Sequence, residues 1–99
     1  MEITGALPVG LEYAGKSHKD FKLRPAKVRD TIEATAEVGT DSNLKFMLAI
    51  LSRQLVALGD IPKEHITSEL LAELYDVDLA ELHEAQETLE KKLRPPKKN

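Results

Sequence analysis

Apolar and polar positions alternate near the start of the chain. The alternating apolar residues are Leu7, Val9, Leu11, Tyr13, Phe21 and Leu23. A period of two predicts strands with one buried face, and Ala14, Gly15 and Lys16 between the two runs suit a turn. Residues 7–24 are therefore predicted to form a β-hairpin, which must rest on helices because an isolated hairpin is marginal in water.

A helix is expected directly after the hairpin. Pro25 stops the second strand and suits the first turn of a helix, because its fixed backbone angle is helical and its missing donor would be unpaired there. The pattern predicts a weakly amphipathic helix over residues 26–38, with Gly39 as its stop. One side of this helix carries Val28, Ile32, Thr35 and Ala36.

The strongest helical pattern spans residues 42–58. Its apolar positions, three and four residues apart, are Leu44, Met47, Leu48, Leu51, Leu55 and Leu58. Asp41 or Ser42 can cap its first turn, and Gly59 and Pro62 prevent it from continuing. Further apolar residues widen this surface beyond one stripe, so this helix is predicted to be the centre of the core.

Two more helices are predicted over residues 67–74 and 78–93. Thr67 or Ser68 can cap the first, and Asp76 or Asp78 can cap the second. The apolar residues of the first are Leu70, Leu71 and Leu74, and those of the second are Leu79, Leu82, Leu89 and Leu93. The narrow line of leucines in the second packs either on the chain's own core or on a helix of another chain.

Together these patterns predict a mainly α fold with a small N-terminal β-hairpin, an α+β arrangement of three to four helices packed on the hairpin. The chain has 99 residues, which is the size of one domain. We expect a single domain over residues 1–94, because Pro95 and Pro96 end the last helix. Residues 95–99 are predicted to be a disordered tail.

Composition excludes several classes of site. The sequence contains no cysteine, so disulfides, thiolate nucleophiles, sulfur-ligated zinc and iron–sulfur clusters are ruled out. His18, His65 and His83 fall in different predicted elements and are expected on the solvated surface. Neither a nucleophile elbow nor a phosphate-binding glycine loop is present. The sequence therefore predicts a binding protein without catalytic residues, metal or cofactor.

Hydropathy and charge indicate where the protein is located and which classes of partner it can bind. No stretch approaches the roughly 20 apolar residues of a membrane span, so a cytoplasmic protein without membrane contact is expected. Residues 60–90 are strongly acidic, whereas the cations of the first third are Lys16, Lys19, Lys22, Arg24, Lys27 and Arg29. This basic cluster could neutralise phosphates, which leaves a small nucleic-acid-binding regulator as an alternative function. A self-associating helical adaptor is a second alternative.

The segment of residues 22–30, Lys-Leu-Arg-Pro-Ala-Lys-Val-Arg-Asp, resembles the signature of the tail assembly chaperones of Mu-like phages and prophages. In that family a hairpin ends in a Leu-Arg-x-Pro-like step, and a helix then opens with an apolar residue and Asp. The order of the parts also agrees, from Pro8 and Val9 to the closing helix, so the resemblance covers residues 7–93. The segment before the last helix departs from the family by being longer and richer in Leu and Glu.

The resemblance implies a chaperone in the cytoplasm of the bacterial host. It would bind the tape measure protein and keep it soluble until tail tube subunits polymerise around it; the tail tube protein and a second copy of the chain are further expected partners. Family members often have a longer form made by ribosomal frameshifting, and the codons for residues 97–99 could supply the slippery run. The residues expected to contact the partner are Leu71, Leu74, Leu79, Leu82, Leu89 and Leu93.

Overall fold

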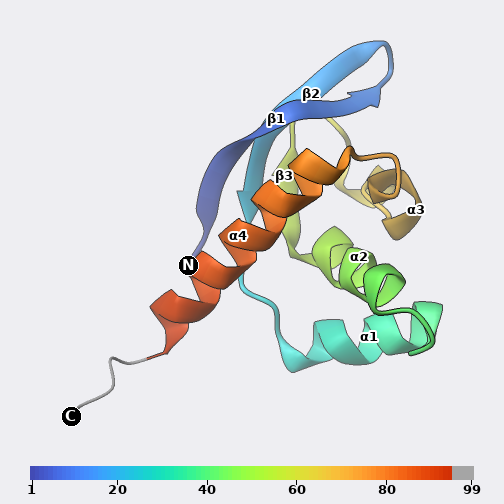
Figure 1. Cartoon of the computed structure of the whole chain (residues 1–99), viewed down its shortest axis with the longest axis vertical. Helices are drawn as coiled ribbons and strands as arrows, with labels where there is room; N and C mark the ends of the chain where they lie inside the picture. The colour runs from blue at the N-terminus through green and yellow to red at the C-terminus, as the bar shows by residue number, and fades with distance from the viewer. Residues whose placement is uncertain (95–99) are drawn as a thin grey trace.

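The computed structural model describes residues 1–94 and shows an α+β fold, as the sequence predicts (Figure 1). The tail predicted for residues 95–99 lies outside the described residues. In chain order the elements are β1 (Ile3–Tyr13), β2 (Lys16–Leu23), α1 (Val28–Val38), α2 (Asn43–Gln54), β3 (Leu55–Leu58), a 3-10 turn η1 (Lys63–His65), α3 (Ser68–Leu71) and α4 (Asp76–Leu93).

The sheet is antiparallel, with β2 between β1 and β3. The predicted hairpin is confirmed and begins earlier, at Ile3, which pairs with Leu23. Ala14 and Gly15 both have positive φ angles, 52° and 78°, which suits the tight turns that join twisted antiparallel strands. The pairing of β1 with β2 is interrupted between Ala6 and Leu11. This irregular part of β1 is where α4 is attached, as described below.

The prediction of a helix over residues 42–58 is wrong at its C-terminal end. α2 ends at Gln54, and Leu55–Leu58 forms β3. Leu55 and Leu58 pair with residues of β2, so a neighbour far away in sequence decides the conformation of this apolar run. The end of α2 is completed by the Lys63 ammonium group, which donates to the carbonyls of Ser52 and Leu55 at 2.7 and 2.6 Å.

The other helices begin and end close to the predicted positions, with physical reasons for each difference. α1 begins at Val28 because Asp30 reaches back to the backbone N–H of Lys27. Thr67 caps α3, but α3 covers only Ser68–Leu71 of the predicted residues 67–74. α4 begins at Asp76, and no side chain caps it. The prediction that Asp76 or Asp78 caps this helix is therefore wrong.

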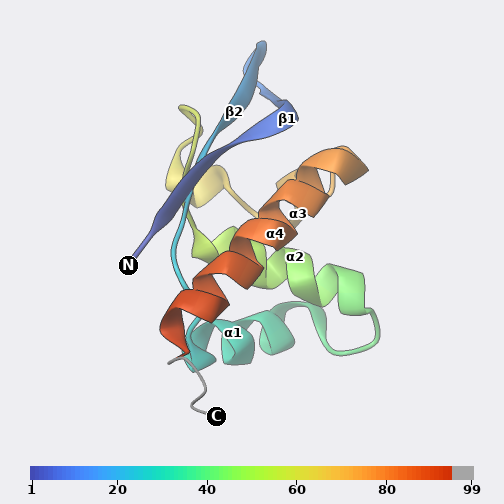
Figure 2. The ribbon, with the colours of Figure 1, turned by 60° about the vertical axis from the view of Figure 1, so that its left-hand side comes forward.

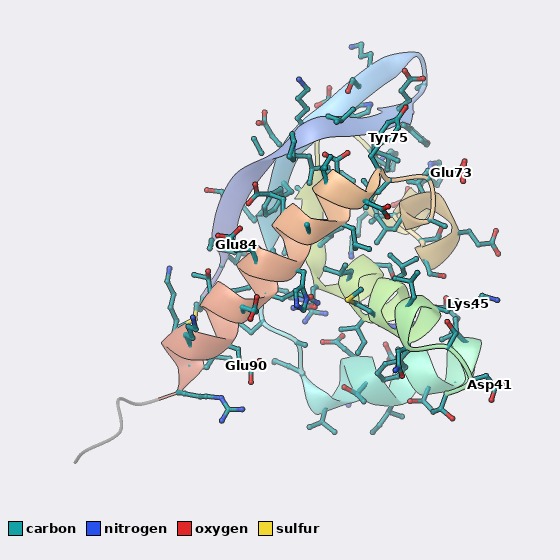
Figure 3. All side chains as sticks on the ribbon, in the orientation of Figure 1. Asp41, Lys45, Glu73, Tyr75, Glu84 and Glu90 are labelled. Carbon is teal, nitrogen blue, oxygen red and sulfur yellow. The ribbon has the colours of Figure 1, made fainter. Side chains whose placement is uncertain are left out.

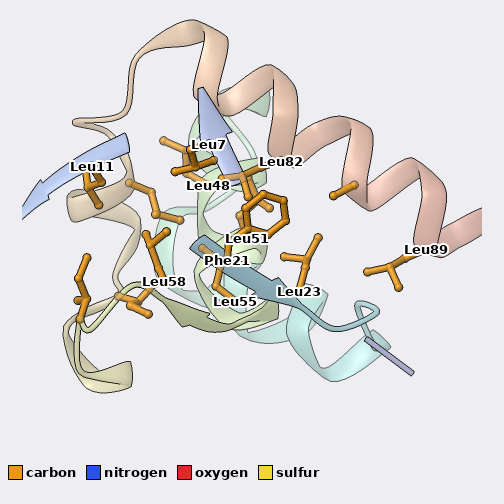
Figure 4. Packing of buried hydrophobic residues seen from close by; sticks show 14 residues of the cluster. Leu7, Leu11, Phe21, Leu23, Leu48, Leu51, Leu55, Leu58, Leu82 and Leu89 are labelled. Atoms are coloured by element: carbon orange, nitrogen blue, oxygen red, sulfur yellow. The ribbon is translucent and has the colours of Figure 1, made fainter. Parts of the chain in front are cut away.

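The core lies between the sheet and the helices α2 and α4. Figures 1 and 2 show α4 crossing the hairpin, with α2 beside β3 and α1 on the side of α2 remote from the sheet. The buried cluster, drawn in Figure 4, contains Leu7, Leu11, Phe21, Leu23, Leu48, Leu51, Leu55, Leu58, Ile61, Ile66, Leu71, Leu82, Ala85 and Leu89. Leucine supplies most of this core. Among residues 1–94, no helix has the length and apolar character needed to cross a bilayer.

Candidate functional site

The leucines predicted to contact a partner do not share one surface. Leu71, Leu82 and Leu89 are fully buried in the core, so a partner cannot reach them in this conformation. Leu74 and Leu79 are partly buried against the same core. Leu93 is 55% exposed. The stripe on α4 therefore serves the chain's own core over most of its length and is open to solvent at its C-terminal end.

Leu93 lies at a groove between α4 and α2, which we call the α2–α4 groove. In Figure 1, α4 runs along the hairpin while α2 points away from it, and a cavity of about 300 Å³ is lined by residues of both helices. Its apolar lining comes from Pro25, Ala26, Ile50, Leu89 and Leu93, and its polar lining from Gln54, His83, Gln86, Glu87 and Glu90. The lining thus combines apolar groups with two carboxylates on α4; Figure 3 labels Glu90 on this helix.

A second hollow adjoins the groove. It has a volume of about 590 Å³ and shares Pro25, Ala26 and Leu93 with the first. Its remaining lining residues are Met1, Glu2, Arg24 and Lys27. Leu93 therefore borders both hollows, of which the second extends from α4 to the residues before α1 and adds charged side chains to the lining.

The polar floor of the α2–α4 groove is already hydrogen-bonded within the chain. The Gln86 side-chain amide donates to the Gln54 side-chain oxygen at 2.7 Å, and the Gln54 amide donates to the Arg24 carbonyl at 3.0 Å. Among the described residues, no buried side-chain nitrogen or oxygen lacks a partner. A ligand in the groove is therefore not needed to satisfy buried polar atoms, and the groove offers mainly apolar contact.

Arg24 and Asp30 form a clasp next to the groove. The guanidinium donates to both oxygens of the Asp30 carboxylate at 2.8 Å, and the Lys27 backbone N–H donates to the same group at 2.7 Å. These bonds, the one from Arg24 foremost, lower the pKa of Asp30 from 3.8 to about 2. The clasp turns the chain from β2 into α1. The Arg and Asp of the segment that resembles the chaperone signature thus have a structural role.

The prediction that all three histidines lie on the surface is wrong for His18, which is 6% exposed. Its Nδ1 accepts a hydrogen bond from the backbone N–H of Asp60 at 3.1 Å, and its Nε2 donates to the Tyr13 carbonyl at 3.0 Å. Both ring nitrogens are therefore occupied. Pairing of His18 with the buried Leu11 across the hairpin is the signal that could have revealed its burial.

Asp78 is also buried, and it joins α4 to β1. Its two carboxylate oxygens accept hydrogen bonds from the backbone N–H groups of Val9, at 2.8 Å, and Gly10, at 3.1 Å. These donors lie in the irregular part of β1, where the pairing with β2 is interrupted. Asp78 is thus an anchor between two elements. In the described part of the chain, no group of three acidic or histidine side chains could hold a metal ion.

The basic cluster of residues 16–29 is dispersed in the fold. Arg24 is held in the clasp with Asp30, and Lys22 lies 3.9 Å from the carboxylate of Glu2. Lys16 follows the hairpin turn, whereas Arg29 is on α1, and these two places are at opposite ends of the molecule (Figure 1). The cations of the cluster therefore lie on β2, on the segment after it and on α1, and not on a single element.

The sequence did not reveal that the apolar side of α1 faces solvent. Val28 is 77% and Ile32 is 64% exposed, and Ala36, two turns after Val28, is exposed as well. The buried residues of this helix are Asp30 and Ala34. The periodicity showed that the apolar residues share one side, but periodicity alone does not tell which side of a helix meets the core.

No family model, curated protein or solved structure matches the chain.

Proposed function

We propose that this chain is a tail assembly chaperone of a Mu-like phage or prophage. It holds an apolar helical segment of the tape measure protein in the α2–α4 groove until tail tube subunits polymerise around that protein. The observation that carries the proposal is the open groove with an exposed Leu93 that borders both hollows. The proposal also rests on the resemblance of residues 22–30 to the family signature.

An amphipathic helix is the occupant that suits this groove. Helix-in-groove recognition places apolar residues three and four positions apart into an apolar depression. The groove supplies Ile50 and Ala26 for that contact, and Leu93 borders both of its hollows. Glu87 and Glu90 line the same groove, so lysine or arginine beside the apolar stripe of the occupant would be favoured.

The groove suits reversible binding. Full burial of one leucine side chain contributes about 2 kcal/mol, and the groove offers only a few apolar side chains of this kind. The occupant buries a similar number of its own apolar side chains, and after the loss of translational freedom on association a dissociation constant in about the micromolar range is expected. Such binding keeps an apolar helix covered and still releases it to the tail tube protein. The chaperone acts in the bacterial cytoplasm by binding alone, without a chemical step.

Co-purification with a tape measure fragment tests the proposal. The fragment, encoded in the same genome, is expressed with the wild-type chain and with Leu93→Glu. Leu93→Glu is expected to weaken binding at least about tenfold, because a carboxylate then faces the apolar depression beside Glu87 and Glu90. Isothermal titration of the purified partners measures the affinity, and the soluble fraction of the fragment measures the chaperone effect.

Val77→Glu is the matched control. Val77 is 54% exposed, against 55% for Leu93, and it lies in the first turn of the same helix, away from the groove. This variant is expected to bind like the wild type. Absence of binding by the wild-type chain at about 100 µM, far above the expected affinity, would show that the proposal is wrong. An equal loss of binding in Leu93→Glu and Val77→Glu would show that the fragment does not bind in the groove.

A further inference from the structure

We propose that the outward face of α1 is a contact surface between two copies of this chain. The two α1 helices run antiparallel about a twofold axis at Ile32. This inference rests on α1 alone and does not depend on the α2–α4 groove or on the proposed function.

The orientation of α1 is fixed by polar contacts, so its apolar side cannot rotate inward. At its start, Asp30 is held by Arg24. Further along, Arg53 of α2 lies 3.3 Å from the carboxylate of Glu33 and 3.0 Å from that of Glu37. Arg53 thus holds the flank of α1 that carries Glu33 and Glu37 towards α2, and the Glu33 side chain stays 51% exposed. Val28 and Ile32 consequently point into solvent. Exposure of apolar side chains of this size is unfavourable, and covering them with another surface would be stabilising.

The exposed face is complementary to itself. Val28, Ile32 and Ala36 are four residues apart and form one stripe. When a second copy lies antiparallel with Ile32 opposite Ile32, Val28 of each copy meets Ala36 of the other. The contact between Val28 and Ala36 therefore occurs twice and the contact between the two Ile32 side chains lies on the axis, as in closed twofold dimers.

Charge complementarity favours a second copy over another occupant. Arg29 and Glu33 are both exposed and follow the same flank of the stripe. In the antiparallel pair, Arg29 of one helix comes to within about 3 Å of Glu33 of the other along the helix axis, given a rise of about 1.5 Å per residue. Two opposite-charge contacts form. Glu33 meets Arg53 of its own chain through Oε1, so Oε2 is the oxygen that would receive Arg29 of the second copy. A partner with a basic flank would instead repel Arg29.

The dimer is expected to be weak. α1 has 11 residues and is therefore about 16 Å long. One short helix from each copy buries less than the roughly 1,200 Å² at the lower end of stable interfaces. The dissociation constant of the dimer should consequently lie between about 10 µM and about 1 mM.

Sedimentation velocity over this range tests the inference. The apparent mass of the wild-type chain is expected to rise from 11.0 kDa towards that of a dimer. Ile32→Lys is expected to remain a monomer. Arg29→Glu and Glu33→Arg are each expected to remain monomers, because like charges then meet across the axis. An equimolar mixture of these two variants restores both opposite-charge contacts and is expected to dimerise again.

Circular dichroism of each variant verifies that it is folded, and Glu37 still pairs with Arg53 in Glu33→Arg. A wild-type chain that stays fully monomeric up to about 1 mM, the upper end of the expected range of dissociation constants, overturns the inference. A dimer that survives Ile32→Lys, or a mixture of charge variants that stays monomeric, also overturns it. If the wild type is monomeric and Ile32→Lys loses the tape measure fragment instead, the face belongs to that partner. Leu93→Glu should leave the dimer intact, so the two proposals fail separately.

Discussion

At the scale of single residues, one carboxylate sets the path of the chain between the sheet and the helices. Asp30 receives two hydrogen bonds from Arg24 and one from the backbone of Lys27. Arginine suits this position because its planar group matches both oxygens of a carboxylate, which a lysine cannot do. The side chain of Asp30 is almost fully buried, so its charge is stabilised chiefly by these partners.

The clasp predicts a dependence of stability on pH. The pKa of Asp30 in the folded chain is about 2, below its usual value of 3.8. A lowered pKa means that the stabilisation is complete above about pH 4 and is lost as the pH falls through 3.8 towards 2. On the order of 2 kcal/mol should disappear in this window. Urea unfolding between pH 2 and 6 measures the loss, and Asp30→Asn should remove this part of it. Asp41→Asn, at an exposed carboxylate, serves as the control and should keep the wild-type dependence.

Gly59 and His18 predict a second effect on stability. Gly59 has a φ of +53°, and a Cβ atom there would lie 2.3 Å from Nδ1 of His18. Gly59→Ala is therefore expected to lower the free energy of unfolding by about 3 kcal/mol, from backbone strain together with a clash in a packed site. Gly15, in the hairpin turn, has a φ of +78° with open space around it, so Gly15→Ala should cost only about 1 kcal/mol. Chemical unfolding compares the two variants.

A double variant separates the clash from the strain. In a His18→Ala chain the ring is absent, so the further change Gly59→Ala should cost about as much as Gly15→Ala, about 1 kcal/mol. If Gly59→Ala costs the same with and without the His18 ring, the close contact between these residues contributes nothing to stability.

At the scale of elements, α4 is held on the sheet by apolar packing and by Asp78. Removal of this carboxylate leaves the backbone N–H groups of Val9 and Gly10 without their partner. Asp78→Ala is expected to lower the free energy of unfolding by about 3 kcal/mol, since each lost bond involves a charged acceptor. Asp76→Ala, in the same helical turn but exposed, should cost about 0.5 kcal/mol through the helix dipole alone.

Hydrogen exchange locates the effect of the Asp78 anchor. The amides of Val9 and Gly10 should exchange faster in Asp78→Ala than in Asp76→Ala, because only the first change removes their acceptor. Equal stability and equal exchange in the two variants would contradict the anchoring role of Asp78.

Local patterns predicted most of the elements, and contacts distant in sequence decided the remainder. The hairpin, α1 and α4 follow from periodicity and from stop signals at Pro25 and Gly39. The run Leu55–Leu58 is apolar throughout, so its local pattern fits a helix as well as a strand. Its pairing with β2 and the capping of α2 by Lys63 made it a strand. Neither contact is visible in a local pattern.

The candidate site was predictable only in part, for a related reason. The leucine line of α4 pointed to Leu93, which lies where the groove meets its neighbouring hollow. The same line contains Leu82 and Leu89, which are buried against the core. The spacing of leucines along a helix does not show where the sheet beneath it ends, and so it does not separate the buried leucines from the exposed one. Ile50 and Ala26 join the groove from other elements, so their contribution appears only in the folded chain.

At the scale of the whole molecule, the α2–α4 groove and the outward face of α1 both lie away from the hairpin turn. Figures 1 and 2 show the hairpin projecting at one end, while α1 and the last turns of α4 lie towards the other. The groove uses α4, α2 and the Pro25 segment, and the proposed contact between copies uses the outer side of α1. One copy could therefore hold a helix and meet a second copy with different residues.

The Asp78 anchor also has a consequence for how the chain folds during its synthesis. Val9 and Asp78 are 69 residues apart, so the first strand leaves the ribosome long before its acceptor exists. Until then the two amides of β1 can bond only to water, and the leucines below them lack the cover of α4. The nascent chain therefore reaches its final packing late, and an incomplete chain exposes an apolar strand to whatever surrounds the ribosome.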